Sequence, residues 1–374
     1  MNIRLFLIAA LFTSSIAGSI GARSHRPAAQ PEESAPVIPG PPPNDTARFL
    51  AGMPVPPNSP LAALTKDPAW QEHSGYFEKA FAKLNTRQLE KLHNWQTANL
   101  PESRNRYPVV YYMFSGPDLL YVDQFFPNAS VYIMCGKEPL GPPPDPSRIT
   151  NLSVAFRNLE NAMNASLTTS YFITEDMKVQ FQQQNLGGTV PILYVFLARA
   201  GKDIQEVSYV SLDRGGGIHQ ARGGTPGVKI VYRDRKSGIT QTLYYFTTDI
   251  SDGGISSNPG FMNFCAHFGV GASFLKSSSY LMFEGSFGRV RNFLLDHSQL
   301  IVQDDSGIPL ANFSSSKWNL RLFGTYVGPL DIFRQYNQPR LHQLFAENNP
   351  QPFPIGFGYQ WNFHRSNLIV ANRN

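Results

Sequence analysis

The chain has 374 residues, of which 13% are aromatic and 16% are charged, and its formal net charge is +5. This composition is typical of a globular protein with a sizeable core, and it excludes a chain that is disordered throughout. The sequence contains no basic run of the kind that binds a phosphate backbone, so we expect no nucleic-acid partner.

The first 22 residues have the pattern of a secretory signal peptide. Arg4 is followed by an apolar run, Leu5 to Phe12, and small residues continue as far as Ala22. The run is too short to cross a bilayer comfortably and no longer one follows, so we expect no membrane span in the mature chain. The pattern predicts a soluble protein exported to the periplasm or the extracellular space, where ATP, NAD and S-adenosylmethionine are lacking.

Residues 23–60 carry 11 prolines in 38 positions. This density predicts a proline-rich disordered arm that makes no contact with the core and acts as a spacer or, alternatively, as a tether. Residues 61–374 are expected to form a single α/β domain that begins with a helical segment.

The first part of this domain is predicted to be helical and then to form a compact βαβ unit. Apolar residues recur at helical spacing from Trp70 to Trp95, with a break at Asn85-Thr86 that offers helix caps. A continuous apolar strand, Pro108–Phe114, is followed by a short helix at Leu119–Phe126 and a second strand at Val131–Cys135. Fully apolar strands of this kind suit a parallel sheet that is covered on both faces.

The middle of the chain is predicted to contain helices at Asn151–Thr168 and Thr174–Gln184, a hairpin of Ile192–Arg199 with Val207–Leu212, a glycine-rich loop at Gly215–Gly224, and a hairpin of Val228–Asp234 with Thr240–Thr247. The glycine-rich loop is expected to be a mobile hairpin loop or, alternatively, a lid.

A βα alternation then resumes, with helices at Phe261–Phe268, Phe287–His297 and Ile332–Glu347, and strands at Ser273–Ser277, Leu300–Gln303 and Leu320–Tyr326 and near residues 357–359 and 368–370. We therefore predict a mixed α/β fold: a mainly parallel sheet with flanking helices, a Rossmann-like outline and an inserted antiparallel hairpin portion. A helical part separate from a sheet is the alternative.

The first βαβ unit is similar in outline to class I methyltransferases over roughly thirty residues. In that family an acidic residue at the end of the second strand holds a ribose, and the resemblance places Glu138 at this position. The turn Ser115-Gly116-Pro117 departs from the family pattern, because it lacks the glycine-x-glycine turn and Pro117 removes a backbone amide. The predicted export also removes the cofactor of that family, so the resemblance implies only an outline of the fold, and the cofactor stays unassigned.

Polar residues follow each strand that we expect to be parallel. Because parallel strands end at one edge of a sheet, these residues are expected to converge there. We assign Asp118, Asp249 and Asp304 as candidate catalytic residues, and Ser115, Glu138, Asp252, Lys276 and Asp305 as candidate ligand-binding residues. Crowded carboxylates can supply an acid and a base, hold Ca²⁺ or Mg²⁺, or accept hydrogen bonds from sugar hydroxyls, although each of them could instead be a turn residue or a helix cap.

These features favour a hydrolase, or a degenerate hydrolase-like protein, that acts on a polar substrate, with a carbohydrate as one candidate. The alternative is a non-catalytic binding or interaction module on the methyltransferase-like outline. The pattern assigns no metal and no cofactor. Cys135 and Cys265 lie in apolar stretches and are expected to be free thiols, with a disulfide as the alternative.

Overall fold

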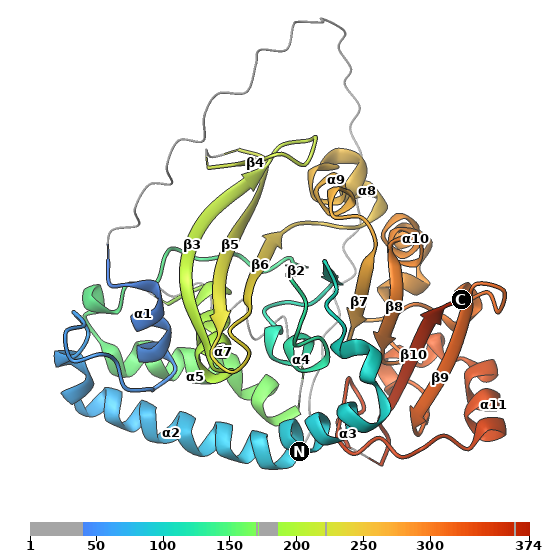
Figure 1. The fold of residues 1–374 in the computed structure, drawn as a ribbon, viewed down its shortest axis with the longest axis horizontal. Helices are drawn as coiled ribbons and strands as arrows, with labels where there is room; N and C mark the ends of the chain where they lie inside the picture. The colour runs from blue at the N-terminus through green and yellow to red at the C-terminus, as the bar shows by residue number, and fades with distance from the viewer. Residues whose placement is uncertain (1–39, 170, 172–185, 221–222, 363) are drawn as a thin grey trace, which may run out of the picture. The chain divides into compact units, whose positions relative to one another are not determined.

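The computed structural model describes residues 40–169, 171, 186–220, 223–362 and 364–374, which group into one compact unit (Figure 1). The expected signal peptide, residues 23–39 of the expected arm and the expected helix Thr174–Gln184 lie outside the described residues. No helix in the described ranges is both long enough and apolar enough for a membrane crossing.

A single ten-stranded sheet organises the described chain, in the order β4-β3-β5-β6-β2-β1-β7-β8-β10-β9. The five central strands are parallel, and their bounds are Thr240–Thr247 for β6, Val131–Gly136 for β2, Val110–Tyr112 for β1, Gly271–Leu275 for β7 and Ser298–Gln303 for β8.

Antiparallel strands flank this parallel centre on both sides. They are β4 (Ile218–His219), β3 (Lys202–Leu212) and β5 (Thr225–Asp234) on one side, and β10 (Asn367–Arg373) and β9 (Trp318–Gly324) on the other. The sheet is therefore mixed, and antiparallel pairing is the commoner kind. This corrects the expectation of a mainly parallel sheet. The difference arises because the hairpin strands join the edge of the same sheet, and because the two last strands pair antiparallel at its far end.

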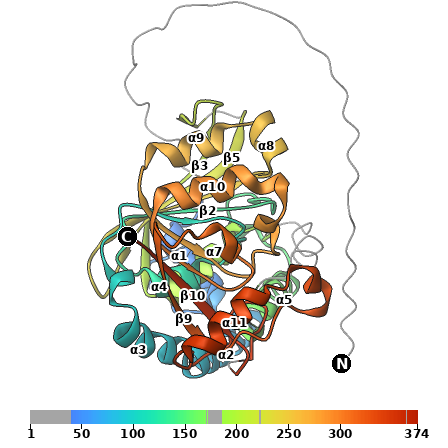
Figure 2. The ribbon, with the colours of Figure 1, turned by 90° about the vertical axis from the view of Figure 1, so that its right-hand side faces the viewer.

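Successive side chains of β1 point to opposite faces of the sheet, so the two faces pack separate cores. Val110 and Tyr112 belong to one hydrophobic cluster, whereas Tyr111 and Met113 belong to the other. The first core is covered by α4 (Leu119–Phe125), α5 (Leu152–Thr169), α7 (Val190–Arg199) and α2 (Pro68–Leu84), and the second by α8 (Asp252–Ser257), α9 (Gly260–His267) and α10 (Gly288–His297). Figure 2 shows α8, α9 and α10 grouped together, apart from α2.

The segment Ile192–Arg199, which we predicted as a strand, is instead part of helix α7. Positions 190–198 are all buried, and the helix packs against α1, α4 and α5. A helix that is enclosed on every side is apolar on every side, so its sequence carries no amphipathic period. A short apolar run of this kind cannot be distinguished from a buried strand by periodicity.

The prediction of a disordered arm is wrong from Pro43 onwards. Helix α1 (Pro43–Leu50) begins with proline at its first turn, and the side chains of Phe49 and Leu50 are fully buried. The amide nitrogen of Ile204, in β3, donates to Asn44 Oδ1 at 2.9 Å. Proline at a first helical turn stabilises the helix, so a proline-rich segment can still begin a packed element.

The predicted helix around residues 70–95 is present, but the expected caps at Asn85-Thr86 are not. A π-helical turn, Asn85–Leu89, joins α2 directly to α3 (Glu90–Asn99), so the helical path continues across the break. At the other end of the chain, the predicted helix Ile332–Glu347 divides into a 3₁₀ segment, Asp331–Tyr336, and α11 (Pro339–Asn348).

Candidate functional site

A pocket of about 270 Å³ lies at the carboxyl ends of the parallel strands. The sheet order reverses beside β1, because the chain proceeds from β1 to β2 on one side and later returns to β7 on the other. In open α/β sheets, such a reversal leaves a crevice where ligands bind. The pocket lining includes Ser115, Gly116 and Asp118 after β1, Lys137 and Glu138 after β2, Asp249 after β6, and Lys276, Ser277 and Ser279 after β7.

A buried ion pair forms part of the pocket wall. Lys276 Nζ lies 2.6 Å from Asp118 Oδ2, and the side chains are 1% and 3% exposed. The Tyr112 hydroxyl donates to the same carboxylate oxygen at 2.8 Å, and the ammonium lies 3.8 Å from the centroid of the Tyr121 ring. Burial raises the pKa of Asp118 and lowers the pKa of Lys276, although each opposite charge acts against these shifts.

Glu138 places a second buried carboxylate in the pocket. Its Oε2 accepts a hydrogen bond from the Tyr245 hydroxyl at 3.3 Å, and Thr247 Oγ1 donates to its main-chain carbonyl at 2.7 Å. A Cβ atom at Gly136 would meet the ends of the Glu138 and Tyr245 side chains, so a larger residue where β2 ends would displace this carboxylate. Strands β2 and β6 together therefore hold this carboxylate in place.

A more exposed ion pair stands beside these buried groups in the pocket lining. Lys137 Nζ lies 3.3 Å from Asp249 Oδ2, and the side chains are 65% and 38% exposed. Burial acts to raise the pKa of Asp249, but hydrogen bonds from Ser251 and the charge of Lys137 hold it below its usual value. Asp249 is therefore an ionised acceptor.

Asp304 and Asp305 follow β8 and lie outside the pocket lining. Asp304 Oδ2 accepts from the amide of Ser277 at 2.9 Å, and its Oδ1 accepts from the amide of Ser306 at 3.0 Å. Asp305 accepts from the Tyr280 hydroxyl. Burial and the charge of Asp305 raise the pKa of Asp304 to about 7. Both carboxyl groups support the loop that carries Ser277.

The two remaining candidates differ in where the structure places them. Ser115 lines the pocket, and its hydroxyl lies within hydrogen-bond distance of the Cys135 carbonyl, at 3.2 Å. Asp252 lies outside the lining, and its Oδ1 accepts from the amide of Arg289 at the start of α10. The pocket thus brings together Ser115, Asp118, Glu138, Asp249 and Lys276, but not Asp252, Asp304 or Asp305.

Backbone strain is concentrated around the pocket. Five non-glycine residues of the described chain have positive φ angles, and three of them, Phe114, Ser277 and Ser279, line it. A fourth, Tyr280, follows directly. Such conformations cost about 1–3 kcal/mol each and cluster at functional sites. The backbone conformations of the turns after β1 and β7 therefore lower the stability of the folded protein.

Several groups at this site were missed by the sequence reasoning. Tyr112 and Tyr245 lie inside strands, and Tyr121 lies on α4, so no position after a strand marked them. Sequence spacing could not find these three tyrosines, because the strand order and the path of α4 bring them to the site. Tyr359, from a distant segment, also lines the pocket, and its hydroxyl donates to the Ser277 carbonyl at 2.9 Å.

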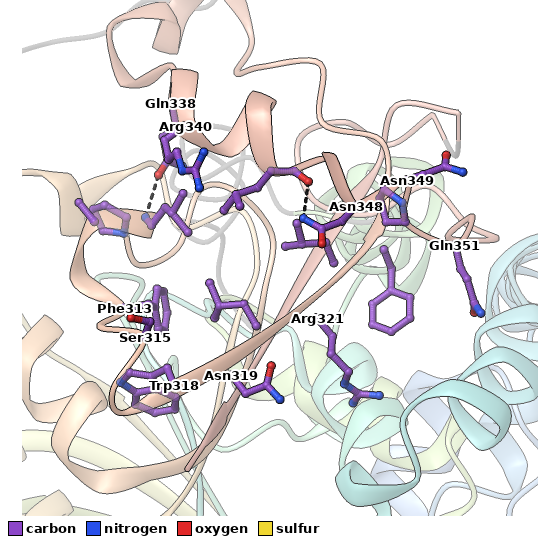
Figure 3. Close-up of a pocket in the computed structure, with 18 of the residues that line it drawn as sticks. Phe313, Ser315, Trp318, Asn319, Arg321, Gln338, Arg340, Asn348, Asn349 and Gln351 are labelled. Atoms are coloured by element: carbon purple, nitrogen blue, oxygen red, sulfur yellow. Dashed lines mark hydrogen bonds between the residues drawn. The ribbon is translucent and has the colours of Figure 1, made fainter. Parts of the chain in front are cut away.

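A larger groove of about 1460 Å³ lies along edge strand β9 (Figure 3). Its lining contains Arg321, Arg340 and several amide side chains, but no aspartate or glutamate. Trp318 and Phe323 are almost fully buried, so neither offers a flat face to a sugar ring. The smaller pocket, with its converging buried charges, is the better candidate site.

The structure also describes the two cysteines and most of the glycine-rich loop. Cys135 and Cys265 are buried free thiols. In the glycine-rich loop, His219 Nε2 lies 2.7 Å from Asp213 Oδ2, and both side chains are about half exposed. Among the described residues, no group of three or more histidine, cysteine, aspartate or glutamate side chains is arranged to hold a metal ion.

Searches of family models, curated proteins and solved structures found no match to this chain. The candidate function therefore rests on the geometry of the site.

Proposed function

We propose that this chain is an exported binding protein with a Rossmann-like sheet, and that it takes a small polyhydroxylated ligand in the pocket after β1, β2 and β7. Numbered along the chain, the five parallel strands stand in the order 3-2-1-4-5, which is the doubly wound order. This order supports the binding-module interpretation and the resemblance of the first βαβ unit to class I methyltransferases.

The observation that carries the proposal is the buried Glu138 carboxylate at the end of β2, within the pocket. A carboxylate with two acceptor oxygens can bind two neighbouring hydroxyl groups of a sugar or a ribose. Asp249, the Ser115 hydroxyl and Lys137 add further polar groups to the same lining. Because the signal-peptide pattern predicts export, a carbohydrate fits the proposal better than a cytoplasmic cofactor.

A hydrolase remains the second candidate, because two buried carboxyl groups, Asp118 and Glu138, line one pocket. Burial raises the pKa of Asp118, which is what a general acid requires, and Glu138 could act as its partner. The combination first expected, with Asp304 as the third member, is less suitable because Asp304 lies behind Ser277.

The two candidates are separated by measuring binding and turnover on the same protein. We expect calorimetry with a panel of monosaccharides and nucleosides to detect binding, and Glu138→Gln to weaken it by about 10–100-fold, because a charged hydrogen bond is lost. The exposed Glu72→Gln on α2 is the matched control. Binding by no member of the panel, or equal binding by the Glu138 variant, would overturn the proposal. Hydrolysis of chromogenic glycosides that is lost in Asp118→Asn would favour the hydrolase.

A further inference from the structure

Lys276 is a buried amine in the wall of the pocket. It directly follows β7, and its side chain is 1% exposed. Among the described residues, the groups that face it include the Asp118 carboxylate at 2.6 Å and the Tyr121 ring, and the charge of Asp304 also acts on it. The amine therefore has a carboxylate within direct proton-transfer distance and an aromatic face that stabilises a cation.

Stability alone gives a weak reason for such a pair. Desolvation offsets much of the attraction in a buried ion pair, and apolar residues of similar volume often serve as well. The described chain offers a comparison in Lys202, whose side chain is 4% exposed. It lies outside the pocket lining and contacts two carboxylates, Asp123 at 2.8 Å and Asp234 at 2.7 Å. Lys276 pairs with Asp118 and lines a ligand-sized space, so its place in the fold is different.

We propose that Lys276 condenses with the carbonyl group of a ligand in this pocket and forms a protonated imine. The inference rests on the proposed function in one respect, because it takes the bound molecule to be a hydroxylated aldehyde or ketone, such as the open-chain form of a reducing sugar. Glu138 would hold the hydroxyl groups while Lys276 meets the carbonyl carbon.

The proposed step balances with groups that are already present. The Lys276 ammonium gives one proton to the Asp118 carboxylate, and the neutral amine attacks the carbonyl carbon to form a carbinolamine. Asp118 returns its proton to the carbinolamine hydroxyl, which leaves as water. The product is an iminium cation paired with the Asp118 carboxylate, so no oxidant or reductant is required. Attack by the amine of a desolvated lysine is a recognised route to covalent intermediates.

Burial favours the first proton transfer. It lowers the pKa of Lys276 and raises the pKa of Asp118, so both shifts favour the neutral amine and the neutral acid. In contrast, the two carboxylates beside Lys202 raise its pKa, although burial acts to lower it. Lys202 should therefore remain protonated and unreactive, which makes it a matched control for burial.

The test is reductive trapping on the full-length protein with glycolaldehyde and sodium cyanoborohydride, followed by peptide mass spectrometry. We expect Lys276 to be modified with saturable kinetics and about tenfold or more faster than Lys202. Lys137, which is exposed at the same pocket, should react without saturation. The proposal would be overturned if Lys276 were modified only after the protein unfolds. It would also be overturned if Lys276 were modified without saturation and at the same rate as Lys137.

Acetaldehyde, which has no hydroxyl group, separates this inference from the proposed function. If both aldehydes modify Lys276 equally, the imine chemistry stands and hydroxyl recognition fails. If glycosides without a free carbonyl bind but Lys276 is never trapped, the proposed function stands and the imine fails. Lys276→Arg keeps a cation beside Asp118 and should abolish the modified peptide. If this variant does not fold, the modification rates of Lys276, Lys202 and Lys137 in the wild-type protein decide whether the imine forms.

Discussion

The indole of Trp70 on α2 donates a hydrogen bond from Nε1 to the main-chain carbonyl of Phe49 at 3.0 Å, and the two rings stack with centroids 5.8 Å apart. Helix α1 is thereby fixed to the helical layer, although it lies in a segment whose composition predicted disorder. The sequence alone predicted that residues 23–60 make no contact with the core, and for α1 this contact reverses the expectation.

Phe49→Ala should therefore lower the free energy of unfolding by about 3–5 kcal/mol, because a fully buried phenylalanine leaves a cavity. Urea denaturation followed by circular dichroism measures the change. Glu72→Ala, on the exposed face of α2, should shift stability by less than about 0.5 kcal/mol. A Phe49 variant as stable as the wild type would show that α1 does not pack in solution.

Asp304 should make stability fall as the pH rises. Burial and the charge of Asp305 raise its folded pKa to about 7, above the value of an unfolded aspartate, so the folded state binds the proton more tightly. The contribution of Asp304 to the free energy of unfolding is complete below about pH 4 and is lost as the pH rises towards 7. The free energy of unfolding then falls by at most roughly 1.4 kcal/mol per pH unit.

Denaturation curves of wild type and Asp304→Asn between pH 4 and 8 test this. The variant should lose part of the pH dependence. It should also be less stable by about 1–3 kcal/mol, because one amide oxygen cannot accept from both Ser277 and Ser306 as the two carboxyl oxygens do. Parallel curves for the two proteins would contradict the assignment.

Lys202→Met should destabilise the fold by about 3–5 kcal/mol, because Asp123 and Asp234 would lose their shared cation inside the protein. The matched control is Lys229→Met, since Lys229 pairs with Glu206 at 3.4 Å on a more exposed part of the same sheet. That change should cost less than about 1 kcal/mol. Equal losses in the two variants would mean that burial does not decide the contribution of these pairs.

Asn349 ends α11 in the left-handed conformation, with φ 41° and ψ 62°. Asn349→Gly should be neutral or stabilising by a few tenths of a kcal/mol, whereas Asn349→Ala should cost about 1 kcal/mol, because alanine resists this conformation. Thermal unfolding of the two variants gives the difference directly. The expectation fails if alanine and glycine behave alike.

The sequence predicted the strand ends better than the strand partners. The βαβ unit could be recognised because β1 and β2 are short apolar runs bounded by turn residues, and both are present as parallel neighbours. The position of β10 between β8 and β9 could not be predicted, because it depends on contacts between segments that are far apart in the chain. Helix α7 was missed because its burial erased the periodic signal that identifies a helix.

The same limit applies to the site. Asp118 and Glu138 could be named in advance because polar residues directly after parallel strands share an edge of the sheet. Asp252 fits the same rule, yet it caps α10, since a side chain after a strand can turn to an approaching helix instead of the pocket. The Tyr121 ring under Lys276 has no local signal and required the path of α4.

The π-helical turn at Asn85–Leu89 has a mechanical consequence. It makes α2 and α3 one rod of roughly 45–50 Å that runs from beneath α1 and α5 towards β9 (Figure 1). At its far end, Trp95 packs edge-on against Phe323 of β9 at 5.0 Å, and the carbonyl of Asn99 accepts a bond from Arg321. The rod links the helical layer at α5 to edge strand β9, and removal of one residue from the π turn would rotate Trp95 away from β9.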